Sequence, residues 1–322
     1  MQAYILRRIY LGALTVLLVS VVIFALMRVA PGDVALMLAM QGQEGISPDA
    51  IPQELLTRIR EEMGLDRPLP MQYLVWMKGM VTLDWGKSYY SGVPIWEEFK
   101  ARAPVTLELA LTAVILATVV GIPAGIIMAL KQDTWMDYLI RVFSLMGMSV
   151  PNFWMGTLVI MVGMLYFNWS PRLVWVSPFE DLPGNFAMYV WPAITTGWVA
   201  QATKARMLRS TMLEVLRQDY IRTAHAKGLR NFVVVYRHAM KNALIPVITI
   251  IGINISVIFG GSVIMETIFQ LPGMGRYLIT GMNQRDYDVV QVMVSVISVW
   301  IVFVNLVVDL TYGWLDPRVR YD

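Results

Sequence analysis

Residues 220–246 read YIRTAHAKGLRNFVVVYRHAMKNALIP, and the position of this basic stretch decides how the rest of the chain is arranged. The stretch carries five Lys or Arg residues, no Asp or Glu, and both histidines of the protein, His225 and His238. Long apolar runs flank it, in a chain of 322 residues that is 57% hydrophobic and only 15% charged. Soluble domains usually carry about 25% charged residues, so this composition indicates a membrane protein.

Six segments are predicted to be transmembrane helices, because about 20 apolar residues suffice to cross the hydrocarbon layer of a bilayer. They are residues 9–27, 105–130, 142–167, 187–203, 243–265 and 289–308, of which the fourth is the shortest. We therefore expect an all-α polytopic membrane protein with six transmembrane helices.

The basic residues favour an orientation with both termini in the cytoplasm, by the positive-inside rule. With Arg7 and Arg8 inside, the cytoplasmic segments carry 2, 2, 9 and 2 basic residues in chain order. The short outside loops, 168–186 and 266–288, carry only 1 and 2, while the loop 28–104 is too long for the rule to apply. The basic stretch is thus expected in the cytoplasm, where part of its charge anchors the topology.

The chain is expected to comprise four parts. These are an N-terminal transmembrane helix (1–30), an extracytoplasmic insertion (31–104), a transmembrane domain (105–316) that includes the basic loop 204–242, and a cytoplasmic tail (317–322).

The insertion reads as a small, partly helical unit. PGD at 31–33 is expected to end the first helix. A second helix is predicted to begin near a cap at Ser47 or Asp49 and to end before Gly64, and MQYLVWMKGMVTL at 71–83 is apolar at helical spacing.

Three spans contain residues that interrupt helices. Gly121 and Pro123 lie within the second span, Pro151 within the third, and Pro246 just inside the fifth. Discontinuous helices often line transport paths, although each proline can also mark an ordinary kink.

The basic loop is predicted to form a rigid elbow of two helices. A helix over 206–227 would extend the fourth span and place Leu208, Met212 and Val215 on one face. Gly228 follows at a position that suits a positive φ. Apolar residues would then lie on one side of the elbow and cations on the other.

The second helix of the elbow is predicted over 232–236, with Asn231 as its cap. The letters FVVVY by themselves are equally consistent with a strand. The surface of such an elbow suits either anionic lipid or a docked cytosolic protein.

The sequence predicts no catalytic residues. The chain has no cysteine, and Gly260-Gly261-Ser262 begins like a nucleophile elbow but lacks its final glycine. His225 and His238 have no nearby carboxylate or thiol that would complete a metal site. The centres of the spans are nearly free of ionisable groups, because Glu108 and Asp309 are expected near helix ends. If the protein transports a solute, a partner must supply the energy.

Several motifs resemble those of permeases from binding-protein-dependent ABC importers, and most closely the first permease of the dipeptide, oligopeptide and nickel branch. YIRTAHAKG at 220–228 matches the Tyr-x-Arg-Thr-Ala-x-Ala-Lys-Gly form of that branch. The generic family motif begins Glu-Ala-Ala, and Arg222, Thr223 and Ala224 stand in those places, so its leading Glu is absent. Similar stretches cover nearly the whole chain: PGD, MGLDRPLPMQYL, LDWGKSYYSGVPIWE, APVTLELAL, ETIFQLPGMGRYL, NQRDYDVVQ, NLVVDLTY and LDPRVRYD.

This resemblance implies an ABC importer type I transmembrane fold and a set of partners. The chain would pair with a second, homologous permease as a heterodimer, bind two cytosolic ATPase subunits, and receive solute from an extracytoplasmic binding protein. ATP and Mg²⁺ would bind to the ATPases, so this chain would hold no cofactor and no metal, and no nucleic acid is expected. It would be a non-catalytic, multi-pass subunit in contact with the lipid of a bacterial inner membrane.

The resemblance, together with the polar residues of the spans, suggests three groups of site residues. The ATPase-coupling residues would be Tyr220, Arg222, Thr223, Ala224, Ala226, Lys227, Gly228, Leu229 and Phe232. The pathway candidates are Ser149, Asn152, Asn254, Ser256, Ser262 and Asn305. The candidates for an outside gate or a binding-protein platform are Glu266, Pro272, Gly273 and Gly275.

Two alternatives remain open at this point. Di- or oligopeptides are the expected solute, but nickel, glutathione or an oligosaccharide would suit the same importer architecture. A channel or carrier that works without ATP would explain the spans but not the hinged basic loop. The small residues of the fifth span can likewise serve helix packing instead of a pathway.

Overall fold

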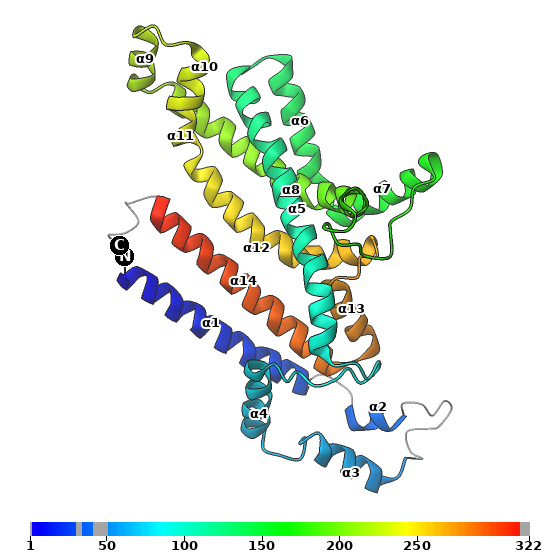
Figure 1. Ribbon diagram of the computed structural model, residues 1–322. Helices are drawn as coiled ribbons and strands as arrows, with labels where there is room; N and C mark the ends of the chain where they lie inside the picture. Colours follow the sequence, from blue (N-terminus) through cyan, green and yellow to red (C-terminus); the bar gives the residue numbers. More distant parts are fainter. Residues whose placement is uncertain (1, 30–33, 41–50, 316–322) are drawn as a thin grey trace. The chain divides into compact units, whose positions relative to one another are not determined.

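The computed structural model describes residues 2–29, 34–40 and 51–315, and most of them are helical (Figure 1). Over these ranges no β-strand forms, and the only extended pairing is an isolated bridge between Lys87 and Pro94. The all-α prediction is therefore confirmed.

Figure 1 shows the order of the helices along the chain. They are α1 (Gln2–Val29), α2 (Val34–Met40), α3 (Gln53–Glu62), α4 (Leu69–Thr82), α5 (Ile95–Leu130), α6 (Trp135–Ser149), α7 (Asn152–Phe167), α8 (Leu182–Leu216), α9 (Asp219–Ala226), α10 (Asn231–Val233), the π-helix η2 (Val234–Ala239), α11 (Met240–Ala243), α12 (Ile245–Ile268), α13 (Met274–Gln284) and α14 (Tyr287–Leu315).

The chain divides into two compact units. The first unit consists of Met1–Gly12, Ala103–Arg276 and Trp300–Asp322, and the second of Ala13–Arg102 and Tyr277–Val299. The first unit holds most of the predicted transmembrane domain, and the second holds the insertion that follows α1.

Four helices of the described chain are long and apolar enough to cross a membrane: α1 over Ile5–Val29, α5, α12, and α14 over Tyr287–Thr311. The pair α6 and α7 makes a fifth span if the two are counted together. These helices contain five of the six predicted spans. The remaining one, 187–203, lies inside α8, which does not meet the same requirements, so the count of six is not fully confirmed.

The third predicted span, 142–167, is interrupted at Pro151, the residue that the sequence marked as a possible break. Helix α6 ends at Ser149, α7 begins at Asn152, and the two axes differ by 103°. Pro151 lies at the break because it lacks the amide hydrogen that would continue the helical hydrogen bonds. Pro123 instead stays inside the continuous α5, and Pro246 lies in the first turn of α12, where a missing N–H costs little.

Helix α8 is at the centre of the first unit, where it contacts α6, α7, α11, α12 and η2. Small residues also bring α5 against it. A Cβ on Gly125 would lie 2.8 Å from the carbonyl oxygen of Ala205, and a Cβ on Gly197 would lie 2.8 Å from that of Ala113. Glycine at these places allows the two backbones to approach closely, as is common between membrane helices.

The second unit confirms both helices predicted for the insertion, as α3 and α4. Gly64 follows α3 with a φ of +64°. Helix α2 was not predicted, and α5 begins at Ile95 rather than near residue 105. Residues 31–33 and the proposed caps Ser47 and Asp49 lie outside the described residues.

Candidate functional site

The basic elbow, which we define as residues 217–244, joins α8 to α12 within the first unit. Helix α8 ends at Leu216, and α9 begins at Asp219, so the continuous helix predicted over 206–227 is wrong. Gln218 has extended backbone angles, φ −71° and ψ 150°, which separate the two helices. The elbow is therefore an element of its own rather than an extension of α8.

Gly228 ends the first helix of the elbow in the conformation that the sequence predicts. Its φ is +75°, its N–H donates to the carbonyl of His225 at 2.9 Å, and the Leu229 N–H donates to that of Ala224 at 3.4 Å. Glycine adopts this left-handed conformation without the steric cost that a Cβ brings. A Cβ here would meet no atom within 4 Å, so the backbone conformation, and not the available space, requires glycine.

The second half of the elbow is helical, which excludes the strand alternative. Arg230 precedes the helix with extended angles, so Asn231 is the first helical residue and not the cap that was predicted. The helix continues as the π-helix η2 and then as α11, and it reaches α12 through Leu244.

The inner face of the elbow is buried in an apolar core of the first unit. Ile221 of α9 and Val234 of η2 are 1% and 0% exposed. The other members come from the elbow itself and from α5, α8 and α12: Ala224, Val235, Ala239, Ala243, Ile126, Ala129, Leu208, Met212 and Val247. Leu208, Met212 and Val215 all take part, which confirms their predicted common face. Because protein interiors are close-packed, a displacement of the elbow is transmitted to all three helices.

The outer face of the elbow is exposed and combines aromatic rings with positive charge. Phe232 is 70% exposed and Tyr236 is 43% exposed, with their ring centroids 4.4 Å apart. All five Lys and Arg side chains of the basic stretch 220–246 are exposed: Arg222, Lys227, Arg230, Arg237 and Lys241. The predicted separation of apolar residues from cations is therefore confirmed for the inner face only, because Leu229, Phe232 and Tyr236 are exposed together with the cations.

The remaining coupling candidates differ in their surroundings. The Tyr220 hydroxyl accepts a hydrogen bond from Asn242 Nδ2 at 2.8 Å, which ties α9 to α11. Arg222 pairs with Asp219 at 3.2 Å on the surface, where such a pair contributes under about 1 kcal/mol. Ala224 faces the core, whereas Thr223, Ala226, Lys227 and Leu229 are exposed.

A buried carboxylate that the sequence did not single out joins α6 to α8. Asp137 is 0% exposed. Its two oxygens accept from Arg209 Nε and Nη2 at 3.0 and 2.8 Å, from Arg141 Nη2 at 2.7 Å, and from the Asp133 N–H at 3.1 Å. The hydrogen bonds to this carboxylate raise the pKa of Arg209 above its usual range. The only sequence signal was the i, i+4 spacing of Asp137 and Arg141.

At the other end of α12 the chain turns around a buried carboxylate. We call residues 266–276 the outer knot. Glu266 is 0% exposed, and its Oε2 accepts from the Arg276 N–H at 3.0 Å. Its own carbonyl accepts from the Leu271 N–H at 2.8 Å. The side chain of Glu266 thus organises the turn from inside.

The glycines of the outer knot are required by space. A Cβ on Gly273 would lie against the Glu266 carboxylate and 2.7 Å from Thr106 Oγ1, and a Cβ on Gly275 would lie 2.5 Å from Val263 Cα. Thr106 Oγ1 also accepts from the Met274 N–H at 2.9 Å. The four predicted gate residues, which include Pro272, therefore lie together, but Glu266 itself is not accessible from the surface.

Among the pathway candidates, only Ser256 and Asn305 are brought together. Ser256 Oγ donates to Asn305 Oδ1 at 2.8 Å, which links α12 to α14. A Cβ on Gly252 would collide with the side chain of Val308 in the same helix pair. This part of α12 therefore serves helix packing, the alternative that the sequence left open.

The other pathway candidates are dispersed. Ser262 is buried and donates to the Phe259 carbonyl at 2.8 Å. Ser149 and Asn152 flank the bend between α6 and α7, and Asn254 Nδ2 is buried without a hydrogen-bond partner among the described residues. No common lining emerges from these four residues within the described chain.

The two acidic residues that were expected near helix ends lie inside their helices. Helix α5 begins at Ile95, so Glu108 is several turns from its start, and its Oε2 accepts from Trp175 Nε1 at 2.9 Å and from Asn185 Nδ2 at 3.0 Å. Asp309 pairs with Arg8 at 2.7 Å, and α14 continues beyond it. Both carboxylates thus connect separate segments of the first unit.

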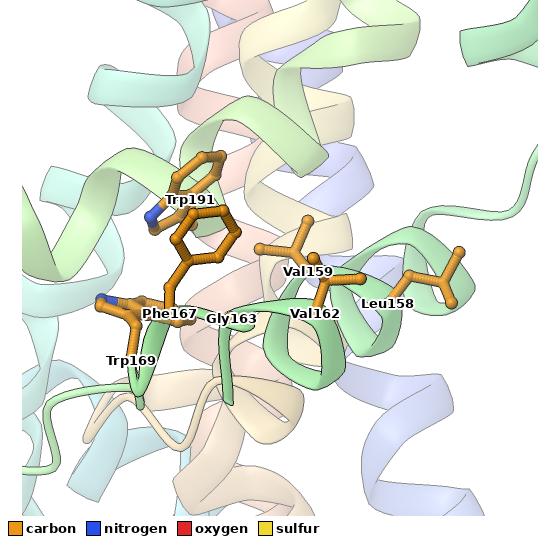
Figure 2. A pocket seen from close by; sticks show the side chains of 7 residues that line it. All are labelled: Leu158, Val159, Val162, Gly163, Phe167, Trp169 and Trp191. Atoms are coloured by element: carbon orange, nitrogen blue, oxygen red, sulfur yellow. The ribbon is translucent and has the colours of Figure 1, made fainter. Parts of the chain in front are cut away.

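An apolar pocket of about 510 Å³ lies where α7 meets α8. Figure 2 shows Phe167, Trp169 and Trp191 gathered at one end and Leu158 at the other. Its remaining lining residues are Val159, Val162 and Gly163. The lining has no charged side chain, so this pocket does not suit a charged solute.

Comparison with known proteins identifies the family. The family model described as "Binding-protein-dependent transport system inner membrane component" matches residues 121–321, and the model for the N-terminal part of such components matches residues 1–110. The chain belongs to the family of binding-protein-dependent transport system inner membrane components. It is a multi-pass inner-membrane protein and a permease subunit of an ABC importer.

Curated relatives match over their full length. The dipeptide transport system permease protein DppB of Escherichia coli (strain K12) is 40% identical over 344 residues, which cover 100% of this chain and 99% of that protein. DppB of Alkalihalophilus pseudofirmus is 37% identical, and the probable peptide ABC transporter permease protein y4tP of Sinorhizobium fredii is 36% identical, each with 100% of both chains covered.

A solved structure shares the fold. The crystal structure of an amino acid ABC transporter with histidines matches with a TM-score of 0.51 and 14% identity, covering 67% of this chain and 94% of that chain. At this identity the likeness concerns the fold alone. It agrees with the ABC importer type I transmembrane fold that the sequence motifs suggested.

Proposed function

We propose that this permease forms half of a translocation pathway for di- or oligopeptides and is driven by two cytosolic ATPase subunits that bind its basic elbow. A second, homologous permease supplies the other half of the pathway, and an extracytoplasmic binding protein delivers the solute. Both termini and the elbow lie in the cytoplasm, in keeping with the nine basic residues of the loop 204–242.

The division of the elbow into two faces is the observation that carries this proposal. The outer face exposes Phe232, Tyr236 and several cations, which suits a partner with an apolar groove and acidic residues. The inner face is built into a core shared with α5, α8 and α12. A partner that moves the elbow therefore moves the ends of three helices with it.

ATP acts in this scheme as a ligand of the partner subunits. It favours the closed ATPase pair, and the closed pair holds the elbows in the positions of one transmembrane state. A ligand shifts such an equilibrium only by its differential affinity for the two states, so a tight and correctly shaped elbow is needed to convert ATP binding into movement. Each exposed charge pair at the contact contributes little, and the exposed rings contribute more.

Peptides are proposed as the solute because the full-length relatives are described as dipeptide or peptide permeases. Nickel, glutathione or an oligosaccharide would require the same architecture with another binding protein. Competition for uptake among these solutes in reconstituted importer would decide between them. A channel or carrier that works without ATP would instead show uptake by this chain alone in liposomes.

Gly228→Ala tests the coupling role. A Cβ in the left-handed conformation costs about 1–2 kcal/mol, which lowers the population of the native elbow roughly 5- to 30-fold relative to relaxed alternatives. In proteoliposomes with all subunits we expect uptake to fall by up to this factor, while the permease stays folded in the membrane.

Gly86→Ala provides the matched control. Gly86 has nearly the same φ, +74°, and a Cβ there would make only an ordinary contact, 3.7 Å from Asp288 Oδ2. It belongs to the second unit and the elbow to the first, so the change in unfolding midpoint that Gly86→Ala produces measures a similar backbone strain at a residue that is not part of the elbow. Equal uptake by Gly228→Ala and the unaltered importer would overturn the coupling role.

A further inference from the structure

Helix α4 of the second unit is apolar on all sides. Its sequence, LPMQYLVWMKGMVT, holds a single charged residue, Lys78, whereas the preceding helix α3, QELLTRIREE, holds five. A helix that is apolar all round is normally enclosed either in the core of a protein or in a membrane. The surroundings of the two faces of α4 distinguish these two cases.

One face of α4 packs against α1. The hydroxyls of Tyr73 and Ser20 share a hydrogen bond of 2.8 Å. The rings of Tyr73 and Trp76 lie with their centroids 5.4 and 6.0 Å from that of Phe24. These residues all belong to the second unit, and Figure 1 shows α4 next to the end of α1. This face of α4 is therefore covered by a membrane-spanning helix.

The contact lies well inside the span of α1. Leu17 is at the middle of that span, Ile5–Val29. At about 1.5 Å per residue, Ser20 and Phe24 lie about 4.5 and 10.5 Å beyond Leu17, within the roughly 15 Å half-thickness of the hydrocarbon layer. A tilt of α1 would bring both residues still closer to the middle of the membrane. The aromatic rings of α4 that touch Phe24 are therefore at the depth of lipid chains.

The opposite face of α4 is exposed and apolar. Leu74 is 61% exposed, and Met71, Val75 and Val81 are exposed as well. Lys78 lies among them, and its long side chain can carry the ammonium group to the edge of an apolar layer. Contiguous apolar patches are uncommon on surfaces that face water, and they mark contacts with membranes or other proteins. Enclosure in the core of this chain is thus excluded for α4.

The surface of α1 beside α4 indicates that lipid covers this exposed face. Leu18, Val22 and Leu26 of α1 are each more than half exposed, within a span of a multi-pass membrane protein. The exposed face of α4 extends this lipid-facing surface, because α4 packs against the same stretch of α1. The 14 residues of α4 measure only about 21 Å, which is too short to cross the bilayer but suits a helix that stays within one leaflet.

We propose that α4 is embedded in the membrane leaflet in which α1 ends, with its exposed face against the acyl chains of phospholipids. The charged helix α3 remains in water. The segment between the first two spans is then not wholly outside the membrane, because α4 anchors it to the lipid. This inference depends neither on the transported solute nor on the ATPase subunits.

The natural lack of cysteine allows single spin labels to test the surroundings of α4. A nitroxide is attached to Leu74→Cys in the full chain in phospholipid nanodiscs. Its collisions with oxygen, which enters the hydrocarbon layer, and with chromium oxalate, which stays in water, are measured by power-saturation electron paramagnetic resonance. Val75→Cys, the neighbouring exposed position at 51%, provides an independent repeat.

Two exposed leucines of the same unit are the matched controls. Leu18→Cys in α1, at 57% exposure, is the reference for lipid, and Leu55→Cys in α3, at 39%, is the reference for water. We expect the label on Leu74→Cys to collide with oxygen as often as that on Leu18→Cys. Its collisions with chromium oxalate should be at least about tenfold fewer than at Leu55→Cys, because a charged complex is excluded from hydrocarbon. The pattern should persist in the assembled importer.

Two outcomes would overturn the inference. Collisions with chromium oxalate as frequent at Leu74→Cys as at Leu55→Cys would place α4 in water. Few collisions with either reagent would mean that protein covers the exposed face: a second copy if this occurs in the isolated chain, or a partner subunit if it occurs only after assembly. Peptide uptake could persist in each of these cases, so the proposed function is tested separately.

Discussion

Glycine is required on both sides of α12, but for opposite reasons. At the basic elbow, Gly228 has open space around it and is needed for its positive φ. In the outer knot, Gly273 and Gly275 have ordinary backbone angles but no room for a Cβ beside Glu266. The elbow leaves one face free for another molecule, whereas the knot is packed on itself around a buried carboxylate.

This difference distinguishes a contact surface from an internal support. A substitution in the knot must displace packed atoms, so it acts on the stability of the permease. A substitution on the outer face of the elbow displaces only solvent, so it acts on the complex. A substitution on the inner face of the elbow should affect both the stability of the permease and the complex, because this face is packed and also belongs to the proposed coupling element.

Gly273→Val should have the largest effect on stability. Its side chain would have to displace the Glu266 carboxylate and Thr106 Oγ1, and overpacking of this kind costs about 1–3 kcal/mol. Moving the buried carboxylate away from the Arg276 N–H adds a further cost of about 1–3 kcal/mol, because a buried hydrogen bond to a charged group is lost. We expect a strongly lowered midpoint of thermal unfolding in detergent and a reduced yield of folded protein.

Gly261→Val is the control for that substitution. Gly261 lies in the same helix as Glu266, and a Cβ there would meet no atom within 4 Å. Its unfolding midpoint should stay close to that of the unaltered protein. A similar loss in both variants would mean that the packing of the knot is not what the glycine protects.

Ile221→Ala should have an intermediate effect. Ile221 is 1% exposed in the core that joins the elbow to α5, α8 and α12, and truncation of a buried Ile costs about 3 kcal/mol. We expect a lower unfolding midpoint together with weaker coupling of ATP hydrolysis to uptake. Loss of stability with fully retained coupling would show that this core does not transmit movement.

Phe232→Ala should have the smallest effect on stability, under about 0.5 kcal/mol, because the ring is 70% exposed. Its effect on the assembled importer should be much larger, since a buried aromatic side chain at an interface contributes about 2 kcal/mol, or roughly 30-fold in affinity. Titration of the purified ATPase subunits against the permease measures this directly. Unchanged affinity would place the ATPase contact elsewhere.

Much of the fold follows from local sequence signals. Apolar runs locate five spans. The rules for helix ends predict the positive φ of Gly228, and helical periodicity predicts the common face of Leu208 and Met212. The sequence does not show which prolines interrupt a helix. Pro151 separates α6 from α7, whereas Pro123 lies inside the continuous α5, although both prolines are in apolar segments. Tertiary packing, which single-sequence rules do not see, decides between these outcomes.

Local motifs predicted which side chains lie together only where the residues are contiguous in sequence. The elbow and the knot each lie within about 30 residues, so their members could be listed from the sequence. The contact between Asp137 and Arg209 joins residues that are 72 positions apart in the chain. No local pattern marks such pairs.

The buried contact between α6 and α8 has a consequence for biosynthesis. Asp137 is made 72 residues before Arg209, so the nascent chain must carry an acidic group whose final counter-ion does not yet exist. Arg141 arrives only four residues later and can neutralise it in the meantime. Arg141 is therefore the counter-ion that Asp137 has until α8 is synthesised, and it still contacts Asp137 in the folded protein, where Arg209 joins it.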